Sequence, residues 1–190
     1  MINRAELKLA AKEQIKGHIG ILLLCYIILT IIVGFSSILS FLTAPPLYLG
    51  LTIIFLNITR GYAPEIKDLF QGFYLFGKVV WLNILLMVFI FLWSLLFFIP
   101  GLIKAHSYAM SFFILAENPE FTAREALNRS KEMMNGHKWE LFVLCLSFIL
   151  WFLLCGITLG LASIYVGPYF TATVTNFYYA VKTESEGQAA

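Results

Sequence analysis

The sequence has few charged residues and almost none inside its long apolar runs. Asp, Glu, Lys and Arg make up 13% of the 190 residues, hydrophobic residues make up 60%, and the mean hydropathy is +0.84. Soluble domains carry about 25% charged residues. A single soluble core could not hide this much apolar surface, so we expect an integral membrane protein. The net charge of only +2 argues against nucleic acid as a partner.

Motifs of known enzyme classes are also missing. The sequence contains no Gly-rich phosphate loop, no HExxH zinc motif and no GxSxG turn. It has no pair of carboxylates within the apolar runs that could act as acid and base. The three cysteines lie inside apolar runs without a CxxC pair, which indicates packed thiols. We therefore expect no enzyme activity, no cofactor and no bound metal.

Six apolar runs are each long enough, or nearly so, to cross a bilayer. The first, third and fifth are long and apolar, and the second, fourth and sixth are shorter, more polar and begin just after a proline. The expected spans are 18–42, 46–59, 79–99, 101–117, 139–160 and 168–182. This pattern predicts an all-α polytopic membrane protein that forms a single domain over 1–190.

The distribution of cations predicts the orientation. Every Lys and Arg except Lys104 lies before the first run, in the second or fourth link, or at the end of the sixth run, whereas links 43–46, 99–101 and 160–168 carry no charge. Positively charged links stay on the cytoplasmic side of a membrane. We therefore expect both termini in the cytoplasm.

A short motif recurs before two of the long runs and indicates an internal repeat. KEQIKGH at 12–18 matches KEMMNGH at 131–137, and a weaker copy lies within 65–78. The predicted units are about 1–60, 61–118 and 119–182, followed by a disordered tail at 183–190. Each unit would consist of a cytoplasmic interfacial helix and a pair of spans. The interfacial helices are expected at 2–16, 65–76 and 122–135, the last opened by a capping box of Thr122 and Glu125.

The short spans are expected inside the bundle, because polar side chains are costly against lipid. Their candidate interior residues are Asn57, Thr171, Thr175 and Asn176. These groups could line a polar path. Alternatively, they could simply hold helices together, since Ser and Thr commonly bond to backbone in membrane helices.

Lys104 is the one cation predicted inside a span, near the uncharged side. At helical spacing it shares a face with Ser107, Tyr108 and Ser111, which could receive an anion. The alternative is that its long side chain reaches the outer interface. On the cytoplasmic side, a further set of cations is a candidate contact with anionic lipid headgroups or a partner protein: Arg4, Lys8, Arg124, Arg129 and Lys131.

Several blocks of the sequence resemble a bacterial family of membrane proteins labelled domain of unknown function number 975. The blocks are RAELK at 4–8, IPGLIKAHSYAM at 99–110, LAENP at 115–119, SK at 130–131 with GHKW at 136–139, and PY at 168–169 with FY at 177–178. The resemblance implies a six-span bundle in the bacterial cytoplasmic membrane and a distant likeness to the membrane domain of some glycerophosphodiester phosphodiesterases. It implies no established activity.

Two functions remain open. The protein could be a non-enzymatic accessory or scaffold that contacts lipids and a membrane or cytoplasmic protein through its cytoplasmic face. Alternatively, it could be a small transporter or channel for a lipid or an anionic or amphipathic solute, using the polar spans. A tightly packed interior would favour the first, and a continuous polar cavity would favour the second.

Overall fold

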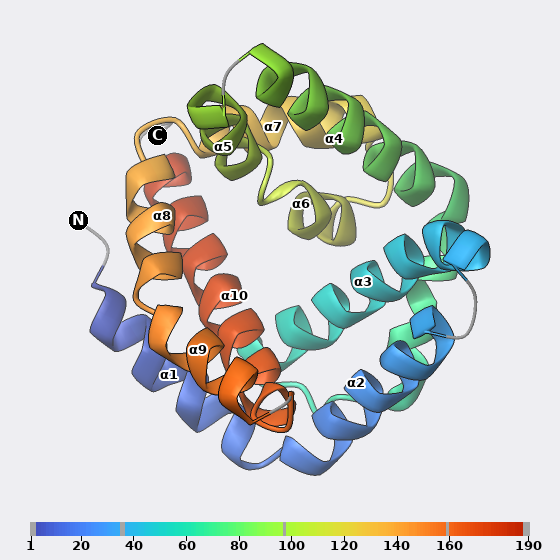
Figure 1. Cartoon of the computed structure of the whole chain (residues 1–190), viewed down its shortest axis with the longest axis vertical. Helices are drawn as coiled ribbons and strands as arrows, with labels where there is room; N and C mark the ends of the chain where they lie inside the picture. Colours follow the sequence, from blue (N-terminus) through green and yellow to red (C-terminus); the bar gives the residue numbers. More distant parts are fainter. Residues whose placement is uncertain (1–2, 35–36, 97, 159, 188–190) are drawn as a thin grey trace.

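The protein is all-helical in a computed structural model that describes residues 3–34, 37–96, 98–158 and 160–187. Figure 1 shows the helices arranged around the molecule's short axis. Their bounds are α1 Arg4–Lys16, α2 Ile19–Gly34, α3 Ser37–Thr59, 3-10 helix η1 Ile66–Leu75, α4 Phe76–Leu96, α5 Phe98–Ser107, α6 Ser111–Glu117, α7 Ala123–Met133, α8 Lys138–Leu146, α9 Ile149–Ile157 and α10 Ser163–Gly187.

Helices long and apolar enough to cross a membrane confirm the expected class of protein. Within the described residues there are three such segments: Ser40–Thr59, Ile66–Ser94 and Lys138–Ile157. The pair α1 and α2, bent by 91°, adds a fourth if it is counted as one span. These candidate spans indicate a multi-pass membrane protein.

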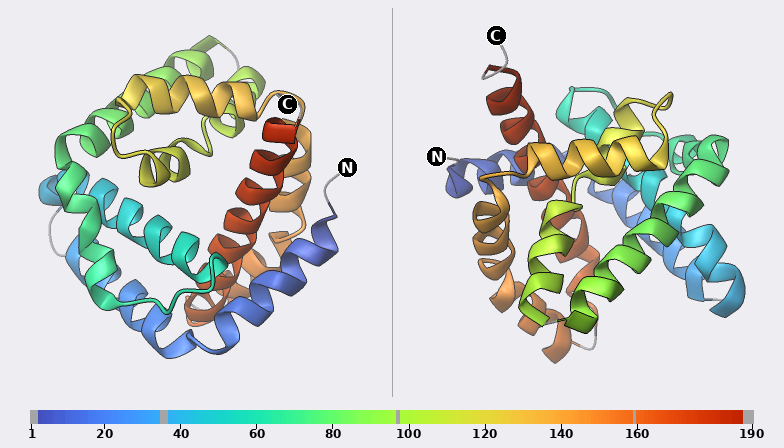
Figure 2. Two further views of the ribbon diagram at one scale, coloured as in Figure 1. Left: turned by 180° about the vertical axis from the view of Figure 1, so that it is seen from behind. Right: turned by 90° about the horizontal axis from the view of Figure 1, so that it is seen from above.

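Helix ends gather on two opposite sides of the molecule. In the right-hand view of Figure 2, α1, α7 and the C-terminal end of α10 lie along one side of the molecule. The ends of α2, α4 and α9 lie toward the opposite side, together with the starts of α3, α5 and α10. The chain therefore forms three helical hairpins, which are α2 with α3, α4 with α5, and α9 with α10.

Burial separates inner from outer helices. In the most apolar stretch of Ser40–Thr59, 61% of the residues are buried, against 17% in Ile66–Ser94 and 17% in Lys138–Ile157. One buried cluster joins α3, α6 and α10 through Leu56, Phe113 and Tyr178, among others. The rings of Phe113 and Tyr178 stack with their centroids 5.2 Å apart. Helices α3, α6 and α10 thus lie toward the interior.

The prediction that prolines begin the short spans is wrong for the second and sixth spans, whereas Pro100 lies in the first turn of α5. The first apolar helix ends at Gly34 rather than 42, and α3 begins at Ser37, so Pro45 and Pro46 lie inside α3. Pro168 likewise lies inside α10, which begins at Ser163. Membrane helices tolerate internal proline because neighbouring groups can satisfy the carbonyls that proline leaves free.

Other boundaries also differ from the expectation. The fourth run is split into α5 and α6 by a turn at 108–110, and the fifth is split into α8 and α9 at 147–148. The predicted disordered tail from 183 is too long, since α10 continues to Gly187. The hydroxyls of Thr183 and Ser185 bond to the carbonyls of Tyr179 and Lys182, which supports this last turn.

The three segments predicted to be interfacial helices do not share one local geometry. α1 is an α-helix followed by Gly17 in an ordinary right-handed conformation. η1 is a 3-10 helix, and its counterpart glycine, Gly77, lies inside α4. α7 opens with the predicted capping box of Thr122 and Glu125 and is followed by Gly136 at φ +92°.

Two glycines allow η1 to lie against α3. A Cβ at Gly50 would be 1.9 Å from the backbone oxygen of Leu69, and a Cβ at Gly72 would be 1.9 Å from that of Pro46. No side chain fits at either position, so the two backbones meet directly. On its other face η1 exposes Phe70, Phe73 and Tyr74.

Candidate functional site at the ends of α3, α6 and α10

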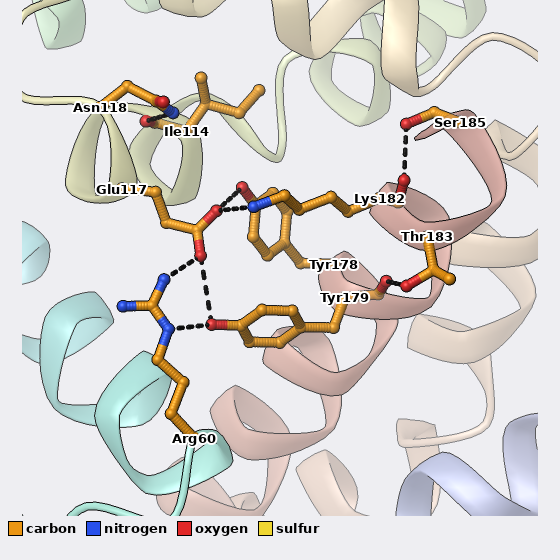
Figure 3. Close-up of polar contacts among 9 residues, drawn as sticks. All are labelled: Arg60, Ile114, Glu117, Asn118, Tyr178, Tyr179, Lys182, Thr183 and Ser185. Atoms are coloured by element: carbon orange, nitrogen blue, oxygen red, sulfur yellow. Dashed lines mark hydrogen bonds and ion pairs between the residues drawn. The ribbon is translucent and has the colours of Figure 1, made fainter. Parts of the chain in front are cut away.

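A polar network joins the charged-side ends of the three inner helices (Figure 3). Its centre is Glu117, whose side chain is only 5% exposed. One carboxylate oxygen, Oε2, accepts hydrogen bonds from Tyr178 at 2.6 Å and from Lys182 at 2.7 Å. The other, Oε1, accepts from Arg60 and from the Tyr179 hydroxyl, which is 3.2 Å away. We call these five residues the Glu117 network.

The end of α3 is shaped so that Arg60 reaches this network. Gly61 has φ +84°, and this left-handed residue lets the N–H of Tyr62 return to the carbonyl of Asn57 at 2.9 Å. The N–H of Gly61 bonds to the carbonyl of Ile58. This is the Schellman pattern that ends a helix at glycine. It ends α3 at Thr59, one residue before Arg60.

Glu117 and the α10 residues are positioned by equally local features. Glu117 is the last residue of α6, where the side-chain amide of Asn118 donates to the carbonyl of Ile114 at 2.8 Å and closes the helix. On α10, Tyr178 and Lys182 are four residues apart and therefore share one helical face. Tyr179 adjoins them and accepts a hydrogen bond from Nε of Arg60 at 2.8 Å.

The network holds one carboxylate between two cations. Burial lowers the pKa of Arg60, but the adjacent Tyr179 and the Glu117 carboxylate raise it more, so its pKa lies above the ordinary value. Both oxygens of Glu117 already have two donors each. A carboxylate held in this way is suited to joining helices rather than to moving protons.

The predicted interior polar residues mostly bond to their own or neighbouring helices. Thr171 contacts the hydroxyl of Tyr26 at 2.7 Å and also bonds to the carbonyl of Gly167. Thr175 bonds to the carbonyl of Thr171. Asn176 donates to the carbonyl of Leu7 and accepts from the amide of Gln14, which fastens α10 to α1.

The fourth predicted interior residue, Asn57, is half-buried at the end of α3. Its carbonyl accepts the bond that closes this helix. The structure therefore places these four residues in helix contacts and helix ends.

The predicted face around Lys104 is interrupted. The helix that would align it with Ser107, Tyr108 and Ser111 breaks after Ser107. The hydroxyls of Ser107 and Ser111 bond to the carbonyls of Ile103 and Tyr108. Lys104 itself lies over the ring of Trp93, with Nζ 4.5 Å from the centroid.

Two cations of α7 and α8 also act on Lys104. Ser130 of α7 bonds to the carbonyl of Ser107 at 2.9 Å, which brings α7 against the end of α5. As a result Lys131 and Lys138 are close enough to Lys104 to repel its charge. The predicted location of Lys104 near the uncharged side stays a prediction.

The predicted cytoplasmic contact residues have different surroundings. Lys8 donates to the carbonyl of Ser147 at 3.2 Å and lies 4.3 Å from the ring centre of Phe148, so it binds the break between α8 and α9. Arg129 is 3.6 Å from Glu132. Arg4, Arg124 and Lys131 are exposed on the charged side.

A lateral groove of about 670 Å³ lies between α3, α4 and the α5–α6 segment. Its lining is mainly apolar, with Tyr48, Asn83 and Tyr108 among the polar members. Among the described residues, no three His, Cys, Asp or Glu side chains gather where they could hold a metal ion.

Sequence reasoning missed the Glu117 network. Glu117 was assigned only to the edge of a span, and Arg60 only to a positively charged link. Both residues lie at the predicted cytoplasmic ends of short spans, and this shared position in the membrane could have indicated that they meet. Two blocks of the family resemblance, LAENP at 115–119 and FY at 177–178, supply Glu117 and Tyr178.

The fold and its candidate spans define a helical multi-pass membrane protein. A family model described as "Protein of unknown function (DUF975)" matches residues 95–185, so this part of the chain is similar to the family that the sequence resembles. No curated protein matches the chain, and no solved structure matches it.

Proposed function

We propose that this protein is a non-enzymatic accessory or scaffold protein of the bacterial cytoplasmic membrane. In this proposal three helical hairpins cross the membrane six times as a repeated unit, and both termini are cytoplasmic. The face that carries α1, η1 and α7 contacts lipid headgroups and a membrane or cytoplasmic protein. The charge pattern and the three hairpins of Figure 2 support this orientation.

The observation that carries the proposal is the filled interior between α3, α6 and α10. Phe113, Phe177 and Tyr178 are each at most 2% exposed and occupy this region. The hydroxyls that could have lined a path instead bond to carbonyls three or four residues earlier, as Thr52, Thr173 and Thr175 do. Such bonds leave no donor directed at a solute.

The Glu117 network supports the same function. It ties the cytoplasmic ends of three inner helices with charged hydrogen bonds, which are stronger than neutral ones. An alternating transporter must separate its helices at one end in each cycle. A fixed network at this end favours a rigid platform.

The lateral groove favours a second function, the transport of a lipid or amphipathic solute. Its volume of about 670 Å³ is that of an ordinary small-molecule pocket. Its position between α3, α4 and α5–α6 would admit such a molecule from the side.

Reconstitution into phospholipid vesicles separates the two functions. The measurements are the movement of a fluorescent phospholipid between leaflets, read by dithionite quenching, and iodide entry, read by an enclosed dye. The accessory function predicts rates equal to those of protein-free vesicles. A protein-dependent increase that Phe112→Trp in the groove suppresses would establish transport instead.

The scaffold function also predicts a partner on one side only. A photo-cross-linking residue at Asn128, which is exposed on α7, should capture a defined protein in bacterial membranes. Reversal of Arg124, Arg129 and Lys131 to Glu should weaken this adduct in a salt-sensitive manner. A cross-linker at Ser163, at the opposite side, is the matched control. Equal adducts from both positions would contradict a cytoplasmic contact face.

A further inference from the structure

Three lysines from separate parts of the sequence meet at the corner of α5, α7 and α8. Lys131 lies in the last turn of α7, and Lys138 is the first residue of α8. Both are near enough to Lys104 of α5 for their charges to repel it. Repulsion of this kind is unfavourable unless an anion balances it.

Nearby carboxylates in the described part of the chain are engaged elsewhere. Glu132 is 3.6 Å from Arg129, and Glu140 is 2.9 Å from Nδ1 of His137. The structure shows no ion pair for Lys131 or Lys138 among the described residues. The corner therefore holds more positive charge than its own acids balance.

A hollow opens beside two of these lysines. It has a volume of about 250 Å³ and is lined by Asn128, Lys131, Glu132, Asn135 and Lys138. The two Asn amides can donate hydrogen bonds as well as accept them. Amide and ammonium donors around a small hollow fit the oxygens of a phosphate group.

The corner is held in shape by α7. Ser130, which is fully buried, donates to the carbonyl of Ser107 and accepts from the N–H of Met110 at 3.2 Å. Gly136, with φ +92°, turns the chain between α7 and α8. Lys131 and Lys138 therefore face the same hollow without needing a flexible loop.

The surroundings place this corner at the level of lipid headgroups. Lys138 begins the candidate span Lys138–Ile157, and the next residue, Trp139, is 71% exposed. Tryptophans mark the boundary between headgroups and hydrocarbon, and lysines there attract anionic lipids.

We propose that the α5–α7–α8 corner binds the phosphodiester headgroup of an anionic phospholipid. The phosphate lies in the hollow between Lys131 and Lys138, and Lys104 supplies a third positive charge on the membrane side. This site rests on the proposed orientation of the cytoplasmic face. It gives that face a specific lipid ligand.

The test uses the full chain in a neutral detergent with soluble short-chain lipids. The probes are dioctanoyl phosphatidylglycerol, dioctanoyl phosphatidylcholine and inorganic phosphate, each titrated while tryptophan fluorescence and the number of bound lipids by native mass spectrometry are recorded. We expect phosphatidylglycerol to bind at least tenfold more tightly than phosphatidylcholine. Inorganic phosphate should not displace it at equal concentration.

Matched variants separate a site from diffuse charge. Lys131→Gln with Lys138→Gln should weaken phosphatidylglycerol binding by about 30-fold, since each cation near a membrane surface contributes about fivefold. Lys104→Met should weaken it by about fivefold. Lys12→Gln with Lys16→Gln removes two exposed charges from α1 and should leave the affinity within twofold of the wild type. Unchanged thermal unfolding without lipid shows that each variant is folded, and Lys138→Gln alone replaces the double variant if it is not.

Three outcomes would overturn the inference. The first is equal affinity for the two lipids, and the second is an equal loss of phosphatidylglycerol affinity in the α1 and corner variants. The third is displacement of the lipid by inorganic phosphate, which would assign the hollow to a free anion. The result is independent of vesicle transport. A transporting protein with this lipid site would refute the accessory function alone, and a non-transporting protein without it would refute the site alone.

Discussion

Glu117→Gln tests whether the Glu117 network holds the inner helices together. The substitution keeps the shape of the side chain and an oxygen that can accept from Tyr178 or Tyr179. It removes the negative charge that faces Arg60 and Lys182. The two cations then remain at the helix ends without their counterion.

The expected loss follows from the exposure of each partner. Breaking a fully buried ion pair costs about 3 to 5 kcal/mol because an uncompensated charge stays buried. Here the carboxylate is 5% exposed, whereas Arg60 is 44% and Lys182 is 32% exposed, so both cations can regain water. We therefore expect Glu117→Gln to lower the free energy of unfolding by about 2 kcal/mol.

The assay is reversible unfolding by sodium dodecyl sulfate in mixed micelles, followed by tryptophan fluorescence. Glu120→Gln is the matched control, since Glu120 is exposed three residues away, and it should change the free energy by less than about 0.5 kcal/mol. In a double-mutant cycle, Lys182→Gln should cost less in the Glu117→Gln background than in the wild type. If Glu117→Gln is no more costly than Glu120→Gln, or if the two network mutations are additive, the network does not hold these helices.

Two further predictions concern local features. Thr122→Ala removes the hydroxyl that caps α7 and should destabilise the protein by about 1 kcal/mol, measured in the same unfolding assay. The bonds from the backbone and hydroxyl of Thr122 lower the pKa of Glu125, so the ionised carboxylate stabilises the folded state above its ordinary pKa of 4.5 and loses that effect as the pH falls through its lower folded value. The wild type should therefore lose stability below pH 4.5 more steeply than Thr122→Ala. Parallel curves of stability against pH would show that the capping box contributes nothing. Gly50→Ala should lower the free energy of unfolding by at least about 2 kcal/mol, because its Cβ would meet the backbone of Leu69 at 1.9 Å. Gly77→Ala in α4, where nothing lies within 4 Å of the added Cβ, is the control and should be neutral or stabilising. A tolerated Gly50→Ala would contradict the close contact of η1 with α3.

Features set by neighbouring residues were predictable from the sequence. The capping box of Thr122 and Glu125 depends on a spacing of three residues, and α7 begins where this spacing predicts. The all-helical class follows from the apolar runs, since only helices or closed barrels satisfy backbone groups in lipid. The inner position of α3 and α10 follows from their hydroxyls and amides.

Features set by contacts between distant helices were not predictable. The ends of the hairpins were misplaced because proline usually marks a helix start, yet Pro45, Pro46 and Pro168 lie inside helices. Glu117 meets Arg60 and Lys182 across 57 and 65 residues of sequence, and the periodicity of one helix carries no such information. The break after Ser107, which interrupts the predicted face of Lys104, is of the same kind, because it lies where α7 packs against the end of α5.

The measurement that most directly tests the proposed arrangement is side-specific cysteine labelling in intact bacterial cells. In a background with Cys25, Cys145 and Cys155 replaced by alanine, one cysteine is introduced at Asn128 on α7 or at Ser163 at the start of α10, and a membrane-impermeant maleimide is added from outside. We expect labelling at 163 in intact cells and labelling at 128 only after the membrane is opened. Labelling of position 128 in intact cells would contradict the cytoplasmic face on which the proposed function and the lipid site both depend.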